Sequence, residues 1–528
     1  MTRYWTALAT LCVGSIAACQ PAAKQPAPDT PPAKAEAAIP EDLDLVILNG
    51  RVMDPESGLD DIRNIGVKDG VIQTITSADL SGAKTIDASG HVVAPGFIDY
   101  HLHGQDPFAV RLGLRDGVTS QLDLEGGAYP VEDYYDAREG KTRNNYGVSV
   151  SHAWARISVM DGIDPKGLGF YTGAINAATH TGAKWNLKRA DPEHIARIQA
   201  ELKDGLDKGA LGIGVPIGYY TAASSPELNA VASVARDSNS FLTTHVRYMA
   251  QIPPSGYLGL QEILSLAAVY DLPLLVHHVP SNCLGLTVDC LDLIDEARAK
   301  GMKVVGEFYP YIYGSSVIGA DYLGPGFRER TGMDYSDIIY NKTGERMTEA
   351  LLKKYRAEDP GGDMLLFHIK KPQMLAAFQR PGVFQGSDGM PFRLADGSIP
   401  DPDAEFGGPV GHPRGAGARA RILRMVREDK VISLMEALAK LSYLQASFLE
   451  DMVPQMKLRG RLKPGAIADI TIFDPETVAD TGEWAEGKYS LPSTGIPYVI
   501  VNGVVAVSDS KVQMDVYAGQ PIRNEVKD

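Results

Sequence analysis

Apolar runs alternate with amphipathic stretches along the middle of the chain. Continuous apolar runs, typical of strands buried on both faces, stand at 92–102, 118–124, 146–152, 210–217, 241–246, 272–278, 302–309 and 383–387. Stretches with helical periodicity stand at 192–208, 226–236, 258–269, 288–300 and 433–449. About eight strand–helix units over roughly 350 residues predict an α/β fold, a (β/α)₈ TIM-like barrel with parallel strands.

Short β segments flank this body at both ends of the chain. Residues 43–54 and 62–76 predict strands with turns at Asn49-Gly50 and Asp69-Gly70, and 498–507 predicts a hairpin around Asn502-Gly503. We therefore expect one small β-sandwich composed of residues 41–94 and 455–520, with the barrel at 95–454. The segment 318–365 interrupts the alternation, which predicts an insertion over the barrel mouth.

The N-terminus predicts export. Arg3 precedes an apolar stretch, 5–18, that is too short to span a bilayer and ends at Cys19. The stretch resembles a bacterial lipobox, which implies a signal peptide at 1–19 and lipidation of Cys19; the alternative is an ordinary secretory signal cut near Ala18. Residues 20–40 predict an Ala/Pro-rich tether. We expect a protein that a lipid anchor holds on the periplasmic face of a membrane. The outer membrane is favoured because Gln20 stands where an Asp would signal retention in the inner membrane. The alternative is a soluble periplasmic protein.

Composition narrows the function further. The net charge of −15 is spread along the 528 residues without a basic patch, which argues against nucleic acid as a partner. No transmembrane helix is expected beyond the signal, so contact with a membrane would come only through the lipid anchor. Cys283 and Cys290 follow the signal, and both a disulfide and two buried thiols are compatible with their spacing.

Metal-type ligands stand at the ends of the apolar runs. His101 and His103 share one face of a strand, because side chains at i and i+2 point the same way. The other candidates are Glu125, His245, one of His277 and His278, and Asp388. Imidazole and carboxylate together suit Zn²⁺ or a similar divalent ion. Separately satisfied histidines and solvated acids are the alternative, which the position of every candidate at a strand end disfavours.

Neighbouring residues predict how such a site would work. Asp99 and Asp123 would lie one layer beneath the ligands, where Asp99 could orient an imidazole. His152 ends another apolar run and is a candidate for lining the site. A divalent metal lowers the pKa of bound water to ~7, and Asp388 could take the proton from that water and pass it to a leaving nitrogen.

Several longer motifs point the same way. They are Ala94-Pro95-Gly96-Phe97-Ile98-Asp99-Tyr100-His101-Leu102-His103, Thr244-His245-Val246-Arg247, Tyr309-Pro310-Tyr311, Gly386-Ser387-Asp388-Gly389, His412-Pro413-Arg414 and Arg459-Gly460-Arg461-Leu462-Lys463-Pro464-Gly465. In combination they resemble the metal-dependent amidohydrolase superfamily, in its N-acyl-D-amino-acid deacylase (D-aminoacylase-like) branch. The resemblance covers residues 43–508, nearly all of the chain after the signal.

The resemblance implies the roles of the ligands. One metal site would use His101, His103 and Asp388, and a second would use His245 and His278, with Zn²⁺ or another divalent metal, one or two per subunit. The branch usually supplies a cysteine after the second strand; none stands there, so Glu125 takes that role as the bridge. Pro280 replaces a lysine that usually holds the substrate carboxylate. Tyr309, Tyr311 and Arg414 remain to bind a carboxylate or carbonyl.

The predicted function is hydrolysis of a C–N amide bond, as in an N-acyl amino acid, by metal-activated hydroxide with Asp388 as general acid and base. A second hypothesis within the superfamily is a cyclic-amide or lactone hydrolase. A third is a non-catalytic, lipid-anchored binding protein, because barrels host many functions.

Overall fold

A parallel sheet forms the centre of the fold. The computed structural model describes residues 42–164 and 183–527, so the predicted signal with Cys19 and the whole predicted tether lie outside it. The eight strands of the central sheet run in the order β16-β12-β11-β10-β9-β8-β7-β6, and each neighbouring pair is parallel. Their bounds are β6 Phe97–Asp99, β7 Val118–Ala128, β8 Asn145–Ser151, β9 Ile213–Val215, β10 Leu242–Thr244, β11 Leu274–Val276, β12 Val304–Phe308 and β16 Phe384–Gln385.

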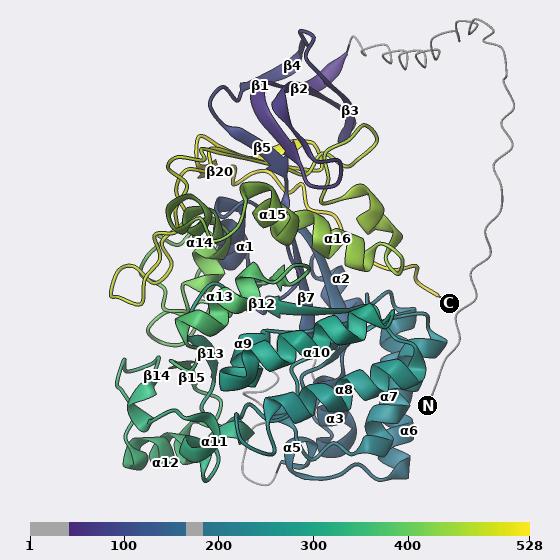
Figure 1. Cartoon of the computed structure of the whole chain (residues 1–528), viewed down its shortest axis with the longest axis vertical. Coiled ribbons are helices and arrows are strands. Elements are labelled where there is room, and N and C mark those ends of the chain that lie inside the picture. The colour runs from purple at the N-terminus through teal and green to yellow at the C-terminus, as the bar shows by residue number, and fades with distance from the viewer. Residues whose placement is uncertain (1–41, 165–182, 528) are drawn as a thin grey trace, which may run out of the picture. The chain divides into compact units, whose positions relative to one another are not determined.

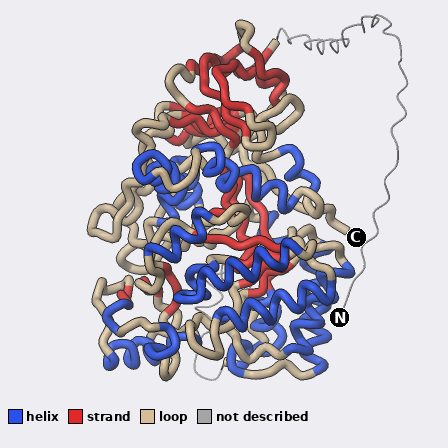
Figure 2. Tube along the Cα trace, viewed as in Figure 1, coloured by secondary structure: helices blue, strands red, loops and turns tan. Residues whose placement is uncertain are grey.

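The ring is nearly closed between its first and last strands. Strands β6 and β16 end the sheet order, but the residues that follow them are joined: the Asp388 amide donates to the His101 carbonyl at 2.7 Å, and Leu102 bridges Gly389. The predicted (β/α)₈ barrel is thereby confirmed (Figures 1 and 2). Each apolar run of the sequence analysis overlaps one of its strands, although β7 extends four residues beyond the run 118–124.

Helices follow the strands and cover the outside of the barrel (Figure 2). They are α1 Pro107–Arg115, α2 Val131–Asp136, α3 His152–Asp161, α5 Lys184–Leu187, α6 Pro192–Asp207, α7 Ser225–Asp237, α8 Gly256–Tyr270, α9 Val279–Cys283, α10 Thr287–Ala299, α13 Lys371–Gln379, α14 Arg414–Asp429, α15 Leu434–Leu438 and α16 Leu444–Leu449. Local chemistry sets their starts. For α6, the Asp191 side chain accepts from the His194 amide and Pro192 occupies the first turn. The five predicted helices are all present, the last interrupted by a π turn at Ala439–Tyr443.

A second sheet joins the two ends of the chain, as expected (Figure 1). Its strands are β1 Leu43–Asp54, β2 Leu59–Lys68, β3 Val71–Thr76, β4 Gly82–Asp87, β5 Val92–Pro95, β17 Ile470–Phe473, β18 Tyr498–Val501, β19 Val504–Ser508 and β20 Lys511–Val512. Strand β5 pairs with β1 on one side and β17 on the other, which unites the two ends. Ile47, Ile65 and Ile470 are fully buried in a core of this sheet's own.

One predicted turn in this sheet is wrong. Strand β1 runs through Asn49-Gly50, and the register with β2 shifts between Ile47 and Gly50, so the positive φ of Asn49 (62°) marks a bulge. The turns at Asp69-Gly70 and Asn502-Gly503 are present, each with positive φ at both residues.

A small antiparallel sheet interrupts the barrel; its first strand precedes the predicted insertion at 318–365. Its strands are β13 Gly314–Val317, β14 Ile338–Tyr340 and β15 Asp363–Leu366, in the order β13-β15-β14. Short helices η3 Asp321–Leu323, α11 Phe327–Thr331 and η4 Tyr335–Asp337, and the longer α12 Glu349–Glu358, connect them. Residues of this sheet line the cavity at the barrel mouth described below.

The two cysteines form a disulfide. Cys283 at the end of α9 is bonded to Cys290 in α10, with their Cα atoms 6.6 Å apart. Of the two states that the sequence left open, the structure contains the disulfide. Among residues 42–164 and 183–527, no helix combines the length and the apolar character needed to cross a bilayer.

Candidate metal centre

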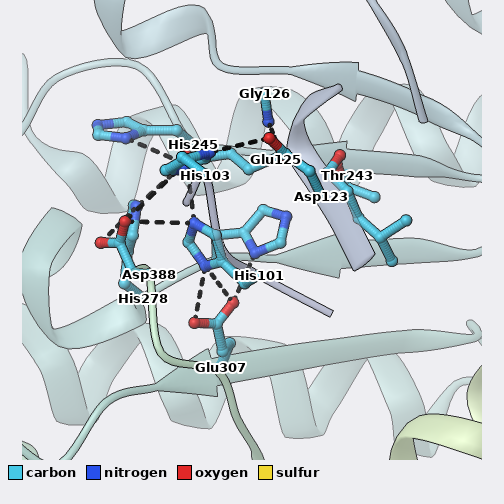
Figure 3. Close-up of polar contacts among 12 residues, drawn as sticks. His101, His103, Asp123, Glu125, Gly126, Thr243, His245, His278, Glu307 and Asp388 are labelled. Carbon is cyan, nitrogen blue, oxygen red and sulfur yellow. Dashed lines mark hydrogen bonds and ion pairs between the residues drawn. The ribbon is translucent and has the colours of Figure 1, made fainter. Parts of the chain in front are cut away.

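The predicted ligands converge at the carboxyl ends of the barrel strands (Figure 3). His101, His103, Glu125 and Asp388 place one ligand atom each within 4.8 Å of the others. The Nε2 atoms of the two histidines lie 3.3 Å and 3.2 Å from Glu125 Oε2, and 3.5 Å and 3.6 Å from Asp388 Oδ1. All four residues are at most 7% exposed. The structure therefore brings this part of the candidate set together.

Glu125 also contacts a second group. Its other oxygen, Oε1, lies 3.0 Å from His278 Nε2 and 3.3 Å from His245 Nδ1. Glu125 thus has one carboxylate oxygen directed to each pair of histidines. This is the geometry that a bridging ligand requires, although its role in binding metal stays a prediction.

The sequence left His277 and His278 undecided, and the structure separates them. His278 turns toward Glu125, with a backbone φ of 28°, while His277 points to Glu307. Asp388 also has a positive φ, 53°. Non-glycine residues in this region cost free energy and concentrate at functional sites.

Glu307 was missed in the sequence analysis. Its carboxylate accepts from His101 Nδ1 at 2.8 Å and 2.9 Å and from His277 Nδ1 at 2.5 Å. A proton held on Nδ1 leaves Nε2 of His101 as the nitrogen available to a metal. A Cβ at Gly386 would lie 2.5 Å from Glu307 Oε1, so this glycine allows the close approach. The signal was a single acidic residue inside the apolar run 302–309.

The expected role of Asp99 needs correction. Rather than binding an imidazole, its carboxylate accepts from the Ser387 amide and hydroxyl at 3.1 Å and 2.6 Å, and pairs with Arg419 at 2.7 Å. Asp99 therefore holds the segment that carries Asp388, because Ser387 immediately precedes it. Asp123 does lie beneath the ligands, 3.2 Å from His103 Nδ1.

The electrostatics of the site keep its carboxylates ionised. Burial opposes the charge on Asp388, but the Arg414 guanidinium, 2.9 Å away, and the neighbouring imidazoles outweigh burial and hold the pKa of Asp388 well below its ordinary value. Burial likewise opposes charge on Glu125, yet His101 and His278 lower the pKa of Glu125. Both carboxylates are therefore ionised and available to bind a cation.

The donor set fits a divalent metal. Both ring nitrogens of His245 and Nδ1 of His278 are buried and have no hydrogen-bond partner among the described residues. Buried polar atoms are normally satisfied, so the two unbonded ring nitrogens of His245, beside the Glu125 carboxylate, suit a metal ligand. His101, His103, Glu125 and Asp388 supply the remaining imidazole and carboxylate ligands that Zn²⁺ accepts.

A small cavity opens onto this cluster. It is lined by Tyr219, His245, Met249, His278, Ser281, Tyr309, Gly314, Ser315, Ser316, Tyr322, Leu366, His368 and Asp388. Of the predicted substrate-binding residues, Tyr309 lines the cavity and Arg414 reaches it by pairing with Asp388 and stacking on Tyr309 at 4.7 Å.

The other two predicted substrate-binding residues lie elsewhere. His152 is fully buried between the Tyr220 hydroxyl and the Glu227 carboxylate, both 3.0 Å from its ring nitrogens. Tyr311 packs against Arg421 and His412 and is also buried. Neither is among the described residues that line the cavity, so their contribution to substrate binding stays a prediction without support from these contacts.

The barrel and its ligand groups together are typical of metal-dependent hydrolases of the amidohydrolase type. Comparison with known proteins makes the class more specific. The chain is 29% identical to an N-acyl-D-glutamate deacylase and 24% identical to a D-aminoacylase, both from Alcaligenes xylosoxydans xylosoxydans, over 88% and 87% of this chain and 93% and 94% of those relatives. These relatives confirm the predicted resemblance to the N-acyl-D-amino-acid deacylase branch.

Solved structures agree with the sequence relatives. The N-acyl-D-glutamate deacylase of Bordetella bronchiseptica, complexed with zinc and a phosphonate mimic of the tetrahedral intermediate, matches with a TM-score of 0.72 and 26% identity, over 92% of this chain and all of that one. A D-aminoacylase structure at 22% identity has the same TM-score and the same coverage, and shares the fold. No family model matches the chain.

Proposed function

We propose that this protein is a zinc-dependent hydrolase that cleaves the C–N amide bond of an N-acyl amino acid. The observation that carries the proposal is the position of Asp388, whose carboxylate lies among both histidine groups and beside Arg414. The N-acyl-D-glutamate, N-acyl-D-aspartate and D-aminoacylase relatives support the amide substrate. A bound divalent metal supplies Lewis acidity, which polarises a carbonyl and lowers the pKa of water to ~7.

The chain's own residues account for the remaining chemistry. His101, His103, Glu125, His245, His278 and Asp388 would hold one or two zinc ions. Asp388, ionised and next to the ligand nitrogens, accepts a proton at its carboxylate and returns it to the departing amine nitrogen. Arg414 and Tyr309 lie beside this carboxylate and can orient a substrate carboxylate or carbonyl.

The substitution Asp388→Ala tests this proposal. We expect turnover of N-acyl amino acids to fall by about 10²–10⁴-fold, the usual contribution of a general acid–base group. Zinc content, measured on the same sample, should largely persist, because the other five ligands remain. The exposed Asp401, in the segment after Asp388, gives the matched control Asp401→Ala. Full activity in Asp388→Ala would contradict the mechanism.

A second candidate substrate class is the cyclic amide. Relatives named dihydroorotase support it, including one from Trichlorobacter lovleyi that is 24% identical over 85% of this chain. Pro280 in place of the usual lysine also weakens the assignment to free amino-acid products. A panel of open N-acyl-D- and N-acyl-L-amino acids, cyclic amides and lactones would decide between the substrates. No turnover of any of them with zinc present would favour the non-catalytic binding protein.

We also propose that the protein is exported and anchored by lipid at Cys19, from the apolar segment 5–18 and the tether that follows. Expression in a bacterium, followed by fractionation and mass spectrometry of the N-terminus, tests this. A diacylated or triacylated Cys19 in the membrane fraction is expected, with Cys19→Ala losing it. A soluble periplasmic protein that begins after Ala18 would support the ordinary signal instead.

A further inference from the structure

A second cavity lies between the small antiparallel sheet and the segment that follows Asp388. Its volume is about 280 Å³, near the lower end of the roughly 300–1,000 Å³ of small-ligand pockets. One wall comes from β14, β15 and their flanks, with Tyr340, Asn341 and Asp363, and the other from residues 390–397 and 410–412. Ser315 lines both this cavity and the one at the metal centre, so the two are neighbours.

Three polar groups of this cavity lack partners among the described residues. The side chains of Arg393 and Asp363 make no hydrogen bond there and no ion pair within 4.0 Å, with each other or with a third residue, and the buried Oδ1 of Asn341 accepts no hydrogen bond. Asp359, by contrast, already accepts from the Tyr340 hydroxyl. The buried Asn341 Oδ1 costs free energy that a hydrogen-bond donor would recover, while Arg393 and Asp363 are half-buried, so water reaches their charges and a ligand of complementary charge could replace it.

The cavity is also built to hold its shape. The backbone of Arg393 pairs with Val410 through two hydrogen bonds of 2.9 Å and 2.7 Å, which ties the two arms of the wall together. Burial raises the pKa of Asp363 to about 6, with the charge of Arg393 acting in the opposite direction. A perturbed carboxyl group and a guanidinium in one small cavity are features typical of binding sites.

We propose that this cavity binds a free α-amino acid. The carboxylate of the ligand would pair with Arg393, and its ammonium group would donate to Asp363 and to Asn341 Oδ1. The side chain would contact the apolar part of the lining, formed by Met390, Pro391, Leu394 and Val410, which favours a small apolar side chain. The ligand class follows from these charges and does not depend on the hydrolytic reaction.

Calorimetric titration of the purified zinc-loaded protein with D-alanine and L-alanine tests the proposal. We expect saturable binding of at least one enantiomer, weakened about tenfold or more by Arg393→Gln and by Asp363→Asn. N-Acetylalanine, which lacks the ammonium group, is titrated into Asp388→Asn so that the proposed hydrolysis does not consume it. It should bind more weakly than alanine, and its residual binding should not change when Asp363→Asn is added. Isopropylamine, which lacks the carboxylate, should likewise be insensitive to Arg393→Gln.

Two controls separate this site from the metal centre and from effects on folding. Arg328→Gln removes an exposed arginine of the same insertion that does not line the cavity, and should bind alanine as the wild type does. Asp388→Asn, which disables the proposed hydrolysis, should leave the titration unchanged. Binding that survives both cavity substitutions, binding that disappears in Asp388→Asn, or no saturable binding of either enantiomer would each overturn the proposal.

Discussion

Two buried clusters of histidine and carboxylate stand near the carboxyl ends of strands in the same barrel, and they differ in how their charges are met. The metal centre contains Glu125 and Asp388 among imidazoles, with atoms of His245 and His278 that lack hydrogen bonds among the described residues. The Glu227 cluster, which consists of His152, Arg156 and Glu227, lies after β8 and on α7.

The Glu227 cluster is neutralised from within. Glu227 Oε1 accepts from His152 Nε2 and from Arg156, while the guanidinium of Arg156 also donates to the carbonyls of Trp185 and Lys188. His152 uses its other nitrogen on the Tyr220 hydroxyl. The position of a histidine at a strand end therefore does not make it a ligand. What distinguishes the metal centre is His245, which lies beside the Glu125 carboxylate and whose two buried ring nitrogens make no hydrogen bond among the described residues.

The largest expected effect is on zinc binding, when the carboxylate of one cluster or the other is exchanged for an amide. Glu125→Gln removes the negative charge and replaces one of two oxygens, each of which faces one histidine group, with an amide nitrogen. Zinc affinity should therefore fall by more than about 100-fold, beyond the 10–100-fold typical of residues that only support ligands. Glu227→Gln should leave zinc content unchanged. Metal analysis of both variants after dialysis measures the zinc content. Equal zinc content in the two would contradict the conclusion that only the first cluster binds metal.

The Glu227 cluster should instead affect the free energy of unfolding. Burial opposes the charge on Glu227, but His152 and Arg156 lower the pKa of Glu227 from 4.5 to about 2, a difference that is linked to about 3 kcal/mol of unfolding free energy. Because this pKa is depressed in the folded protein, the stabilisation is fully present above pH 4.5 and is lost as the pH falls toward 2. Urea unfolding of wild type and Glu227→Gln measures this at pH 7 and pH 3. The difference in unfolding free energy between the two proteins should be smaller at pH 3 than at pH 7. A larger difference at pH 3 would contradict the assignment.

A smaller effect is expected from the carboxylate behind the metal centre. Glu307→Gln replaces the acceptor of two Nδ1 protons with an amide, which should disturb the orientation of His101 and weaken zinc binding by about 10–100-fold. Competition with a chelator measures the affinity, and excess zinc should restore most turnover. Glu201→Gln, which alters a carboxylate bonded to Tyr129 outside the site, is the control. An unchanged zinc affinity in Glu307→Gln would show that His101 is oriented without it.

Periodicity was sufficient for most of the fold and much of the site. Alternation along a strand placed His101 and His103 on one face, and the end of each apolar run located Glu125, His245 and Asp388. Both faces of a buried parallel strand are apolar, so alternation could not choose between His277 and His278. The choice depends on a local turn of the backbone at His278, which no periodic pattern encodes.

Long-range pairing explains the rest of what sequence reasoning missed. Glu307 lies 206 positions from His101, its partner, and only the closed ring of strands brings them together. Asp99 was expected to support an imidazole because it lies on the same face as His101. It instead holds Ser387, because the last strand returns beside the first. The bulge at Asn49 replaced a predicted turn, since the strand pairing on both sides of it outweighed the local turn signal.

The seam between the first and last barrel strands has a consequence for how this protein would fail under stress. Strand β16 contributes only Phe384 and Gln385, and past it the ring depends on contacts such as the one from the Asp388 amide to His101. Asp388, the residue proposed to carry the proton, therefore also helps to close the ring of strands. Heating that loosens this short junction would misplace the proton carrier while the rest of the barrel stays folded, so catalytic inactivation should precede global melting.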